Sequence, residues 1–290
     1  MHIGITGASG LIGRHLTHLA LRRGHEVIAF SRSPQRRIPG CEMRAFHSET
    51  TPDLSGCEGV VHLAGESVLG VWTAAKKKRI LNSRVEGTRR LAEAMAALQH
   101  PPDVLVSGSA IGIYEDGGEQ PLLENAALGN GFLAQTGKAW EHEAVCAAAG
   151  RVVVLRTGIV LAREGGALPL MARAFRMGLG GRLGDGKQWM SWIHVDDLAS
   201  LILFCLENGD LRGPVNGTAP WPVRNAEFTR ELAARLRRPA VLPVPAFALR
   251  WLGEFSDELL GSKKVLPGVA TENGFPFRFP ELAKALADLL

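Results

Sequence analysis

Short runs of apolar residues alternate with longer segments of helical periodicity along the first half of the chain. The strand-like runs span 2–6, 25–32, 59–65, 103–110 and 151–160. Helical patterns span 14–23, 76–98 and 138–149. Continuous apolar strands that alternate with helices are typical of a parallel sheet covered on both faces. We therefore predict an α/β fold with a doubly wound parallel sheet.

A glycine-rich turn joins the first predicted strand to the first helix. Gly7, Gly10 and Gly13 are spaced G-x-x-G-x-x-G between the two elements. Glycines let the backbone turn tightly and approach a pyrophosphate, which the free N–H groups and dipole of a helix N-terminus stabilise. A purely structural turn is the alternative. Because the required strand and helix flank it, we predict a dinucleotide site with contacts from Gly7, Ser9, Gly10, Leu11 and Ile12.

The end of the second strand distinguishes the two nicotinamide cofactors. An acidic residue there accepts a hydrogen bond from the ribose of NAD, whereas arginine suits the 2′-phosphate of NADP. The chain has Ser31 and Arg32 at this point, followed by Arg36 and Arg37, and no acid. The alternative is a solvated basic loop. The pattern favours NADP.

Composition and charge exclude several other classes. The chain has 290 residues, of which 46% are hydrophobic and 21% charged, enough for a large core. Its four cysteines are scattered, so neither a disulfide framework nor a metal site is expected. The net charge of +4 comes with one basic run, 76-KKKR-79, which we interpret as a solvated helix face, so no nucleic-acid partner is expected. With no signal peptide or apolar span in view, we predict a cytoplasmic protein without membrane contact.

The sequence resembles the short-chain dehydrogenase/reductase superfamily in its extended form. Within it, the chain is most similar to the atypical subgroup labelled epimerase family or NAD-dependent epimerase/dehydratase-like. The resemblance rests on 6-TGASGLIG-13, 61-VHLAGE-66, 80-ILNSRVEGTRRL-91, 107-SGSAIGIY-114, 139-AWE-141, 156-RTGIVL-161, 165-GGALPLM-171, 178-GLGGRLGDGKQWMSWIHVDDLA-199 and 213-GPVNGTAPWPVRNAEF-228. The segments 243–267 and 274–280 resemble the C-terminal part of that subgroup. The resemblance covers nearly the whole chain and implies an NAD(P)-binding Rossmann fold.

The resemblance also implies further cofactor contacts. Extended members bind the adenosine and pyrophosphate side of the cofactor with the stretch that here contains Leu63, Ala64 and Gly65. Where they usually have asparagine before Val-x-Gly-Thr, this chain has Arg84, which we expect to reach the pyrophosphate; an exposed salt-bridging arginine is the alternative. Ser107 and Ile159 complete the expected cofactor set.

The catalytic residues of the superfamily are only partly present. Its members use a serine, a tyrosine that transfers a proton and a lysine four residues later that lowers the tyrosine pKa. Ser109 and Lys138 match the serine and the lysine, but Ala134 stands where the tyrosine belongs. Tyr114 is the only tyrosine of the chain. We predict that Tyr114 lines the site as a substitute donor, or else that it is a packed aromatic with a bonded hydroxyl. Glu141 is another candidate acid.

The second half of the chain supplies a smaller substrate lobe. We expect the Rossmann domain to span 1–160, with a late strand near 213–218 returning to it, and the lobe to comprise 161–212 and 219–290. In extended members this region binds the anionic part of the substrate, for which Arg173, Arg176, Arg182 and Lys187 are candidates. The last amphipathic helix is expected near 247–260.

Two function classes remain open. One is an NADP-dependent oxidoreductase or epimerase acting on a small, anionic, sugar-like or carbonyl substrate, which Ser109, Lys138 and the full substrate lobe favour. The other is an NADP(H)-binding protein without catalysis, a cofactor sensor or partner-binding scaffold, which the missing tyrosine favours. The sequence leaves the substrate and the oligomeric state open, a homodimer included.

Overall fold

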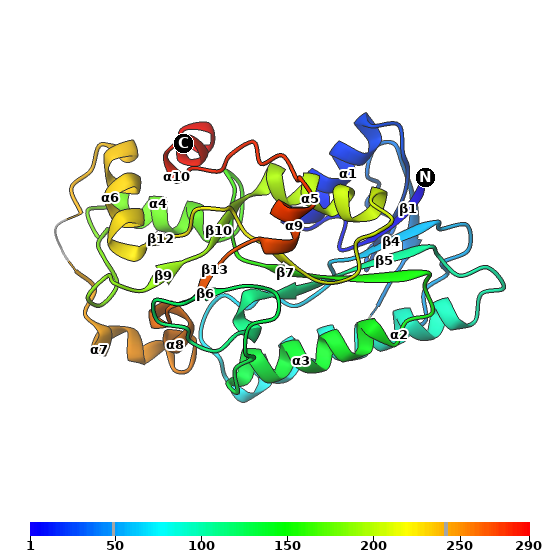
Figure 1. The fold of residues 1–290 in the computed structure, drawn as a ribbon, viewed down its shortest axis with the longest axis horizontal. Coiled ribbons are helices and arrows are strands. Elements are labelled where there is room, and N and C mark those ends of the chain that lie inside the picture. The colour runs from blue at the N-terminus through cyan, green and yellow to red at the C-terminus, as the bar shows by residue number, and fades with distance from the viewer. Residues whose placement is uncertain (48–49, 241–242) are drawn as a thin grey trace.

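A seven-stranded parallel sheet forms the centre of the molecule (Figure 1). The computed structural model describes residues 1–47, 50–240 and 243–290. Its strand order is β11-β7-β5-β4-β1-β2-β3, and every neighbouring pair is parallel. The strands are β1 His2–Thr6, β2 Glu26–Ser31, β3 Cys41–Ala45, β4 Gly59–His62, β5 Val104–Ala110, β7 Arg151–Thr157 and β11 Gly213–Gly217. This confirms the predicted doubly wound sheet.

Helices cover both faces of this sheet because its central strands are apolar on both sides. Ile3, Val61 and Val106 belong to the core on one face, where α1 (Leu11–Arg22) and α5 (Val195–Glu207) pack together. Val60 and Leu105 belong to the core on the other face, which is covered by α2 (Ala74–Ala96) and α3 (Phe132–Val145). Figure 1 shows these two helix pairs above and below the strands.

Local signals explain where the helices begin and end. Thr73 caps α2, because its side-chain oxygen accepts a hydrogen bond from Lys76 N at 3.2 Å. Gly24 follows α1 with φ +81°, a backbone conformation that favours glycine and ends the helix there. α3 begins at Phe132, six residues before the apolar pattern that predicted it, because Gly131 supplies an extended cap.

The rest of the chain forms a second layer of structure beside the carboxyl ends of the strands (Figure 1). Its elements are η1 Ile111–Ile113, β6 Pro121–Leu122, β8 Ile159–Leu161, α4 Leu168–Arg176, β9 Trp189–Met190, β10 Trp192–His194, β12 Val223–Arg224, α6 Asn225–Leu236, α7 Ala246–Leu249, η2 Arg250–Leu252, α8 Phe255–Leu260, β13 Lys264–Val265, α9 Gly268–Glu272 and α10 Leu282–Leu289. Three short strand pairs, β8 with β10, β9 with β12 and β6 with β13, connect these pieces. Trp192 and Phe228 are fully buried in their shared core.

The second half of the chain returns to the sheet twice. β11 pairs with β7 at the sheet edge, where a late strand near 213–218 was expected, and α5, within the range 161–212 expected in the lobe, packs against α1 on the sheet. The single helix expected at 247–260 is wrong: Gly253, with φ +63°, separates α7 and η2 from α8. A left-handed backbone conformation cannot continue an α-helix, so the chain turns there.

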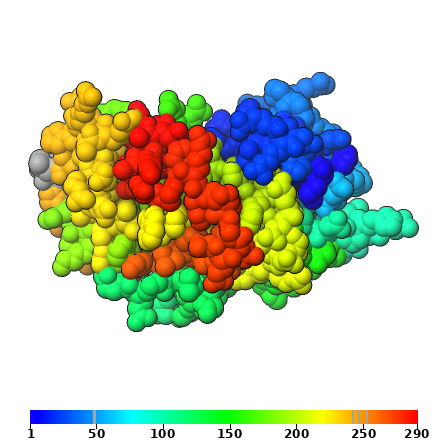
Figure 2. Space-filling model, turned by 45° about the horizontal axis from the view of Figure 1, so that its top comes forward, coloured from blue at the N-terminus to red at the C-terminus, as the bar shows by residue number. Residues whose placement is uncertain are grey.

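The C-terminal segment is fastened across the molecule. Figure 2 shows it in red between α1, in blue, and the golden region of α6. The carboxylate of Asp197 on α5 accepts hydrogen bonds from the backbone N–H groups of Arg278 and Phe279, at 3.0 and 2.8 Å. The Phe279 ring stacks on His194 with ring centroids 3.9 Å apart. These contacts fix α10 on the lobe.

Candidate cofactor site

The glycine turn after β1 is packed so tightly that side chains cannot replace its glycines. Gly7 has φ +72°, and a Cβ atom there would lie 2.9 Å from the carbonyl carbon of Leu63. A Cβ atom on Gly13 would lie 2.2 Å from the Gly7 oxygen. The turn thereby brings the N-terminus of α1 close to the backbone of 63–65, as a phosphate cradle requires.

The N-terminus of α1 has free hydrogen-bond donors. Its cap, Gly10, offers no side-chain acceptor, and the first turn contains no acidic residue. Ser9 and Gly10 are exposed, while Leu11 and Ile12 are half-buried. Such a terminus stabilises an anion through its N–H groups and dipole. The N-terminus of α1 is therefore suited to an anionic group.

Thr6 and His62 hold the 63–65 loop against this turn. The Thr6 Oγ1 atom accepts hydrogen bonds from the N–H groups of Leu63 and Ala64, at 3.1 and 3.2 Å, and lies 2.7 Å from His62 Nδ1. Burial, and next the charge of Arg84, lowers the pKa of His62 to about 4. His62 is therefore a neutral structural residue beneath the site.

Ser31 and Arg32 lie at the carboxyl end of β2, next to β1. The Ser31 hydroxyl accepts a hydrogen bond from Ser33 N at 3.1 Å, and its proton stays free to donate. Arg32 is exposed and has no ion pair among the described residues. Both side chains are therefore placed where the adenosine ribose of a dinucleotide lies when its pyrophosphate occupies the glycine turn.

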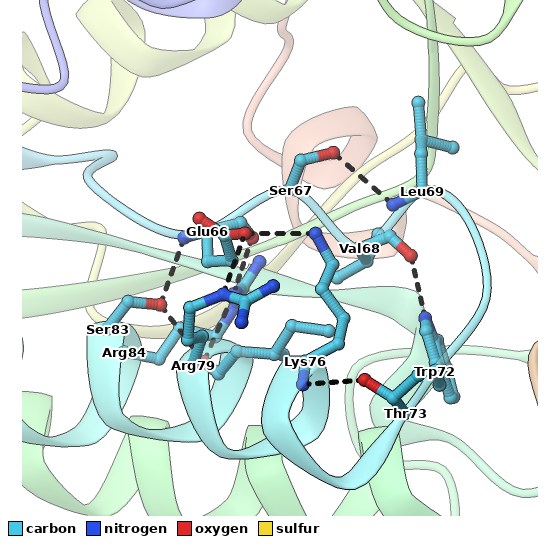
Figure 3. A network of polar contacts seen from close by, with 11 residues as sticks. Glu66, Ser67, Val68, Leu69, Trp72, Thr73, Lys76, Arg79, Ser83 and Arg84 are labelled. Carbon is cyan, nitrogen blue, oxygen red and sulfur yellow. Dashed lines mark hydrogen bonds and ion pairs between the residues drawn. The ribbon is translucent and has the colours of Figure 1, made fainter.

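A polar network fastens the loop after β4 to α2 (Figure 3). The Glu66 carboxylate accepts from Lys76 Nζ at 3.0 Å and lies 3.5 Å from Arg79 Nε. Glu66 N donates to Ser83 Oγ at 2.9 Å. Trp72 Nε1 donates to the Val68 oxygen at 2.7 Å and closes the loop on itself. The hydrogen bond from Lys76 lowers the pKa of Glu66, so this carboxylate stays ionised.

Arg84 extends from α2 under the same loop. Its guanidinium donates to the carbonyl oxygens of Glu66, at 2.9 Å, and Ile80, at 3.3 Å, and lies 5.0 Å from the Trp140 ring. Burial lowers its pKa to about 10, so it is charged at neutral pH. Its hydrogen-bond acceptors are backbone carbonyl oxygens rather than carboxylates, and its guanidinium lies next to Gly65. The exposed salt-bridging alternative therefore does not describe this arginine.

Ser109, Glu141 and Arg156 form a hydrogen-bonded chain between β5, α3 and β7. Ser109 Oγ donates to Glu141 Oε1 at 2.6 Å. Arg156 binds the same carboxylate through Nε and Nη2, at 2.9 and 2.8 Å. Burial alone would lower the pKa of Arg156, but the hydrogen bonds to Glu141 and Tyr114 raise it. The single proton of Ser109 is thus engaged, so this hydroxyl can only accept a hydrogen bond from a further partner.

Tyr114 lies on the far side of this chain and is only 2% exposed. Its hydroxyl donates to Asn216 Oδ1 at 2.6 Å and accepts from Arg156 Nη1 at 2.9 Å. Burial raises its pKa above the ordinary value, although Arg156 opposes the shift. A proton donor in a reductase needs the opposite shift. This geometry is that of the second predicted alternative, a packed aromatic residue whose hydroxyl is hydrogen-bonded.

The other sequence-predicted residues are dispersed. Lys138 donates to Asn130 Oδ1 at 3.3 Å, and no described hydrogen bond or ion pair joins it to Ser109 or Tyr114. Ser107 is fully buried, with its hydroxyl 3.4 Å from the Gly108 oxygen. Ile159 begins β8, immediately beyond the carboxyl end of β7.

The sequence of α3 explains why no tyrosine–lysine pair forms on the helix face that carries Glu141. Side chains four residues apart lie on one face of a helix. One and two turns before Glu141 on α3 stand Gly137 and Leu133, which carry no titratable group. Glu141 was predicted only as a candidate acid, and its role as the partner of Ser109 was not predicted. Asn216 and Glu66 lie in motifs that carry the resemblance, but their contacts were not predicted, because only the fold creates them.

Comparison with known proteins decides the family. The profile of the NAD dependent epimerase/dehydratase family matches residues 3–216. The chain belongs to this family. A domain of unknown function, DUF1731, matches residues 244–289. Across this family the chain is 36% identical to the epimerase family protein YfhF of Bacillus subtilis, covering 100% of this chain and 98% of that protein. It is 35% identical to the human epimerase family protein SDR39U1, covering 100% of both.

Solved structures of family members have the same fold. A crystal structure of human SDR39U1 (isoform 2) with NADPH superposes with a TM-score of 0.92 at 34% identity, covering 100% of this chain and 99% of that one. A nucleoside-diphosphate sugar epimerase from Corynebacterium glutamicum gives 0.81 at 33% identity, covering 99% of this chain and 57% of that one. The resemblance inferred from the motifs is therefore confirmed, and the chain is NAD(P)-binding and epimerase-like in family.

No described helix has both the length and the apolar composition needed to cross a membrane. Nor do the residues outside 48–49 and 241–242 contain a cluster of metal-binding side chains.

Proposed function

We propose that this protein binds NADP(H) across the carboxyl ends of β2, β1, β4 and β5. The glycine cradle against Leu63 carries this proposal, since a Cβ atom on Gly7 or Gly13 would fill the space. Ser31 and Arg32, without an acid beside them, support the phosphorylated cofactor. The human relative solved with NADPH supports the same choice. When bound, the cofactor supplies a hydride donor or acceptor.

Isothermal titration with NADPH and NADH tests this proposal. We expect NADPH to bind at least about tenfold more tightly than NADH, since charge-assisted hydrogen bonds to the 2′-phosphate each contribute about 1.5–3 kcal/mol. Arg32→Ala should remove the preference, while Arg37→Ala, five residues on in the same basic loop, should keep it. Equal affinities in the wild-type protein would refute the NADP assignment.

A second candidate function is an oxidoreductase or epimerase acting on a small, anionic, sugar-like or carbonyl substrate. The 2.6 Å hydrogen bond from Ser109 to Glu141 favours it. A substrate hydroxyl that donates to Ser109 Oγ could pass its proton on, since Ser109 already donates to the Glu141 carboxylate. This polarity suits proton removal from an alcohol better than polarisation of a carbonyl.

Turnover of phosphorylated or carboxylated sugar alcohols with NADP⁺ tests this candidate. Reduced nicotinamide should form, and Ser109→Ala should lower kcat by about 100-fold without changing cofactor affinity. Lys138→Met should have no such effect, because Lys138 lies outside the network. If no substrate of these classes is oxidised while NADPH binds tightly, the protein is an NADP(H)-binding protein without this catalysis.

A further inference from the structure

The loop after β4 and the first half of α2 together carry more positive than negative charge. Lys76 and Arg79 share the single carboxylate of Glu66, and Arg84 donates only to carbonyl oxygens nearby. Three cations therefore face one carboxylate, an excess of two positive charges. Lys77 does not add to it, because Lys77 pairs with Glu254. Cations in such excess favour an anionic ligand.

The topology places this cluster at the nicotinamide end. The 2′-phosphate side of the cofactor belongs at β2, and the pyrophosphate at β1 and α1. β4 follows on the other side of β1, and β5 with Ser109 follows β4. Arg84 links the cluster to Trp140 on α3, the helix that carries Glu141. A substrate that meets the nicotinamide would therefore lie beside Lys76 and Arg79.

Aromatic side chains from three segments pack together next to this cluster. The Trp72 ring packs on Phe132 of α3 and on Phe255 of α8, with ring centroids 5.3 and 5.5 Å apart. Lys77 Nζ lies 5.1 Å from the centroid of Phe132. Within the cluster the Lys76 side chain is 15% exposed, so solvent screens it less than that of Arg79, which is 59% exposed. The cluster differs from the exposed arginines of the second layer, such as Arg173 and Arg182, because its cations gather around one carboxylate.

We propose that Lys76 and Arg79 bind an oxyanion of the substrate, a phosphate monoester or a carboxylate group, in exchange for their contact with Glu66. The inference deepens the proposed function and rests on it for the identity of the neighbouring cofactor. Glu66 holds the two cations in place in the free protein. An entering phosphate dianion balances the excess charge, and a carboxylate group offsets half of it. Glu66 is thus an internal competitor of the substrate anion.

Titration of inorganic phosphate and of malonate into the NADPH-saturated protein, at constant ionic strength, tests this inference. We expect saturable binding, and the tighter of the two probes distinguishes a phosphate from a carboxylate substrate. Lys76→Met and Arg79→Met should each weaken binding by about tenfold. Lys78→Met, an exposed cation on the same helix, is the matched control and should bind as the wild-type protein does.

Glu66→Gln separates a binding role from a structural one. Removal of the competing charge should tighten probe binding by about fivefold, whereas a network that only fastens the loop would be loosened and bind more weakly. Weaker binding in Glu66→Gln would overturn the inference. So would Lys76→Met or Arg79→Met variants that lose NADPH affinity but keep probe affinity, since the cluster would then serve the cofactor. Arg79 is 59% exposed, so its variant should fold.

The same titration distinguishes failure of this inference from failure of the cofactor assignment. If NADPH does not bind, the probes are titrated into the cofactor-free protein. Weaker binding in Arg79→Met than in Lys78→Met then still supports the oxyanion subsite. Equal binding in these two variants overturns it, whichever cofactor state is used.

Discussion

Tyr114 joins three segments through one hydroxyl group. It donates to Asn216 at the sheet edge and accepts from Arg156, which also donates to the Glu124 oxygen at 2.8 Å. Tyr114→Phe should leave two buried polar groups without that partner and lower the free energy of unfolding by about 1–3 kcal/mol. NADPH affinity should not change. Urea denaturation and cofactor titration measure the two effects.

Thr136→Val is the control for this substitution. Thr136 is also buried, but its hydroxyl has no hydrogen-bond partner among the described residues, so the isosteric change should cost little. A Tyr114→Phe protein as stable as the wild type, or one that binds NADPH less tightly, would show that the hydroxyl acts elsewhere.

His62 makes stability depend on pH. Burial lowers its folded-state pKa from 6.5 to about 4, so between these values the unfolded chain binds the proton and the folded protein does not. The contribution of His62 to the free energy of unfolding is therefore fully present above pH 6.5. It falls as the pH drops toward 4, by up to about 1.4 kcal/mol for each pH unit. Unfolding free energies at pH 7, 6 and 5 should fall less steeply in His62→Asn, and identical slopes would contradict this.

At the scale of elements, the sequence predicted those features whose causes are local. The β1–turn–α1 unit was predictable because an apolar run, a glycine triplet and a helical pattern follow one another within about 20 residues. The Ser109–Glu141 contact was not predictable, because it depends on the register of α3 against β5. The nearby Lys138 was predicted as the catalytic partner instead. A shift of one residue turns a helical side chain by about 100°, so four-residue spacing counted from the wrong residue misplaces the whole face.

The glycine turn should be intolerant of substitution in a specific way. In Gly13→Ala the new Cβ atom would lie 2.2 Å from the Gly7 oxygen and must displace α1 from the cradle. We expect at least about a tenfold loss of NADPH affinity, because both the turn and the helix dipole are displaced. Gly24→Ala, at the other end of α1, is the control. Its φ of +81° makes alanine cost about 1–2 kcal/mol of stability, but no neighbour lies within 4 Å, so affinity should persist. Isothermal titration of both variants checks this pair.

At the scale of the molecule, three segments far apart in the chain meet beside the proposed cofactor site. The loop after β4, the start of α3 and α8 meet at Trp72, Phe132 and Phe255. No periodicity in the sequence indicates that Phe255 would contact Trp72, because the contact depends on how the second layer docks on the sheet. The expected helix at 247–260 also missed the turn at Gly253, which lets α8 reach α2.

The packing of Phe255 in this cluster should control how firmly α8 is held beside the nicotinamide end. Phe255→Ala removes one ring of the aromatic cluster, and such contacts contribute about 0.5–1.5 kcal/mol beyond the area that they bury. Amide hydrogen exchange in α8 should therefore become several-fold to about tenfold faster, since local opening follows the lost free energy. NADPH should also dissociate faster. The control is Trp251→Ala on η2, where the side chain is 87% exposed and its loss should change neither rate. Faster exchange in both variants would mean that the segment is held as a whole by other contacts. Unchanged exchange in Phe255→Ala would mean that polar contacts, such as the Lys77–Glu254 ion pair and the hydrogen bond from Gln188 to the Leu259 oxygen, fasten α8 instead.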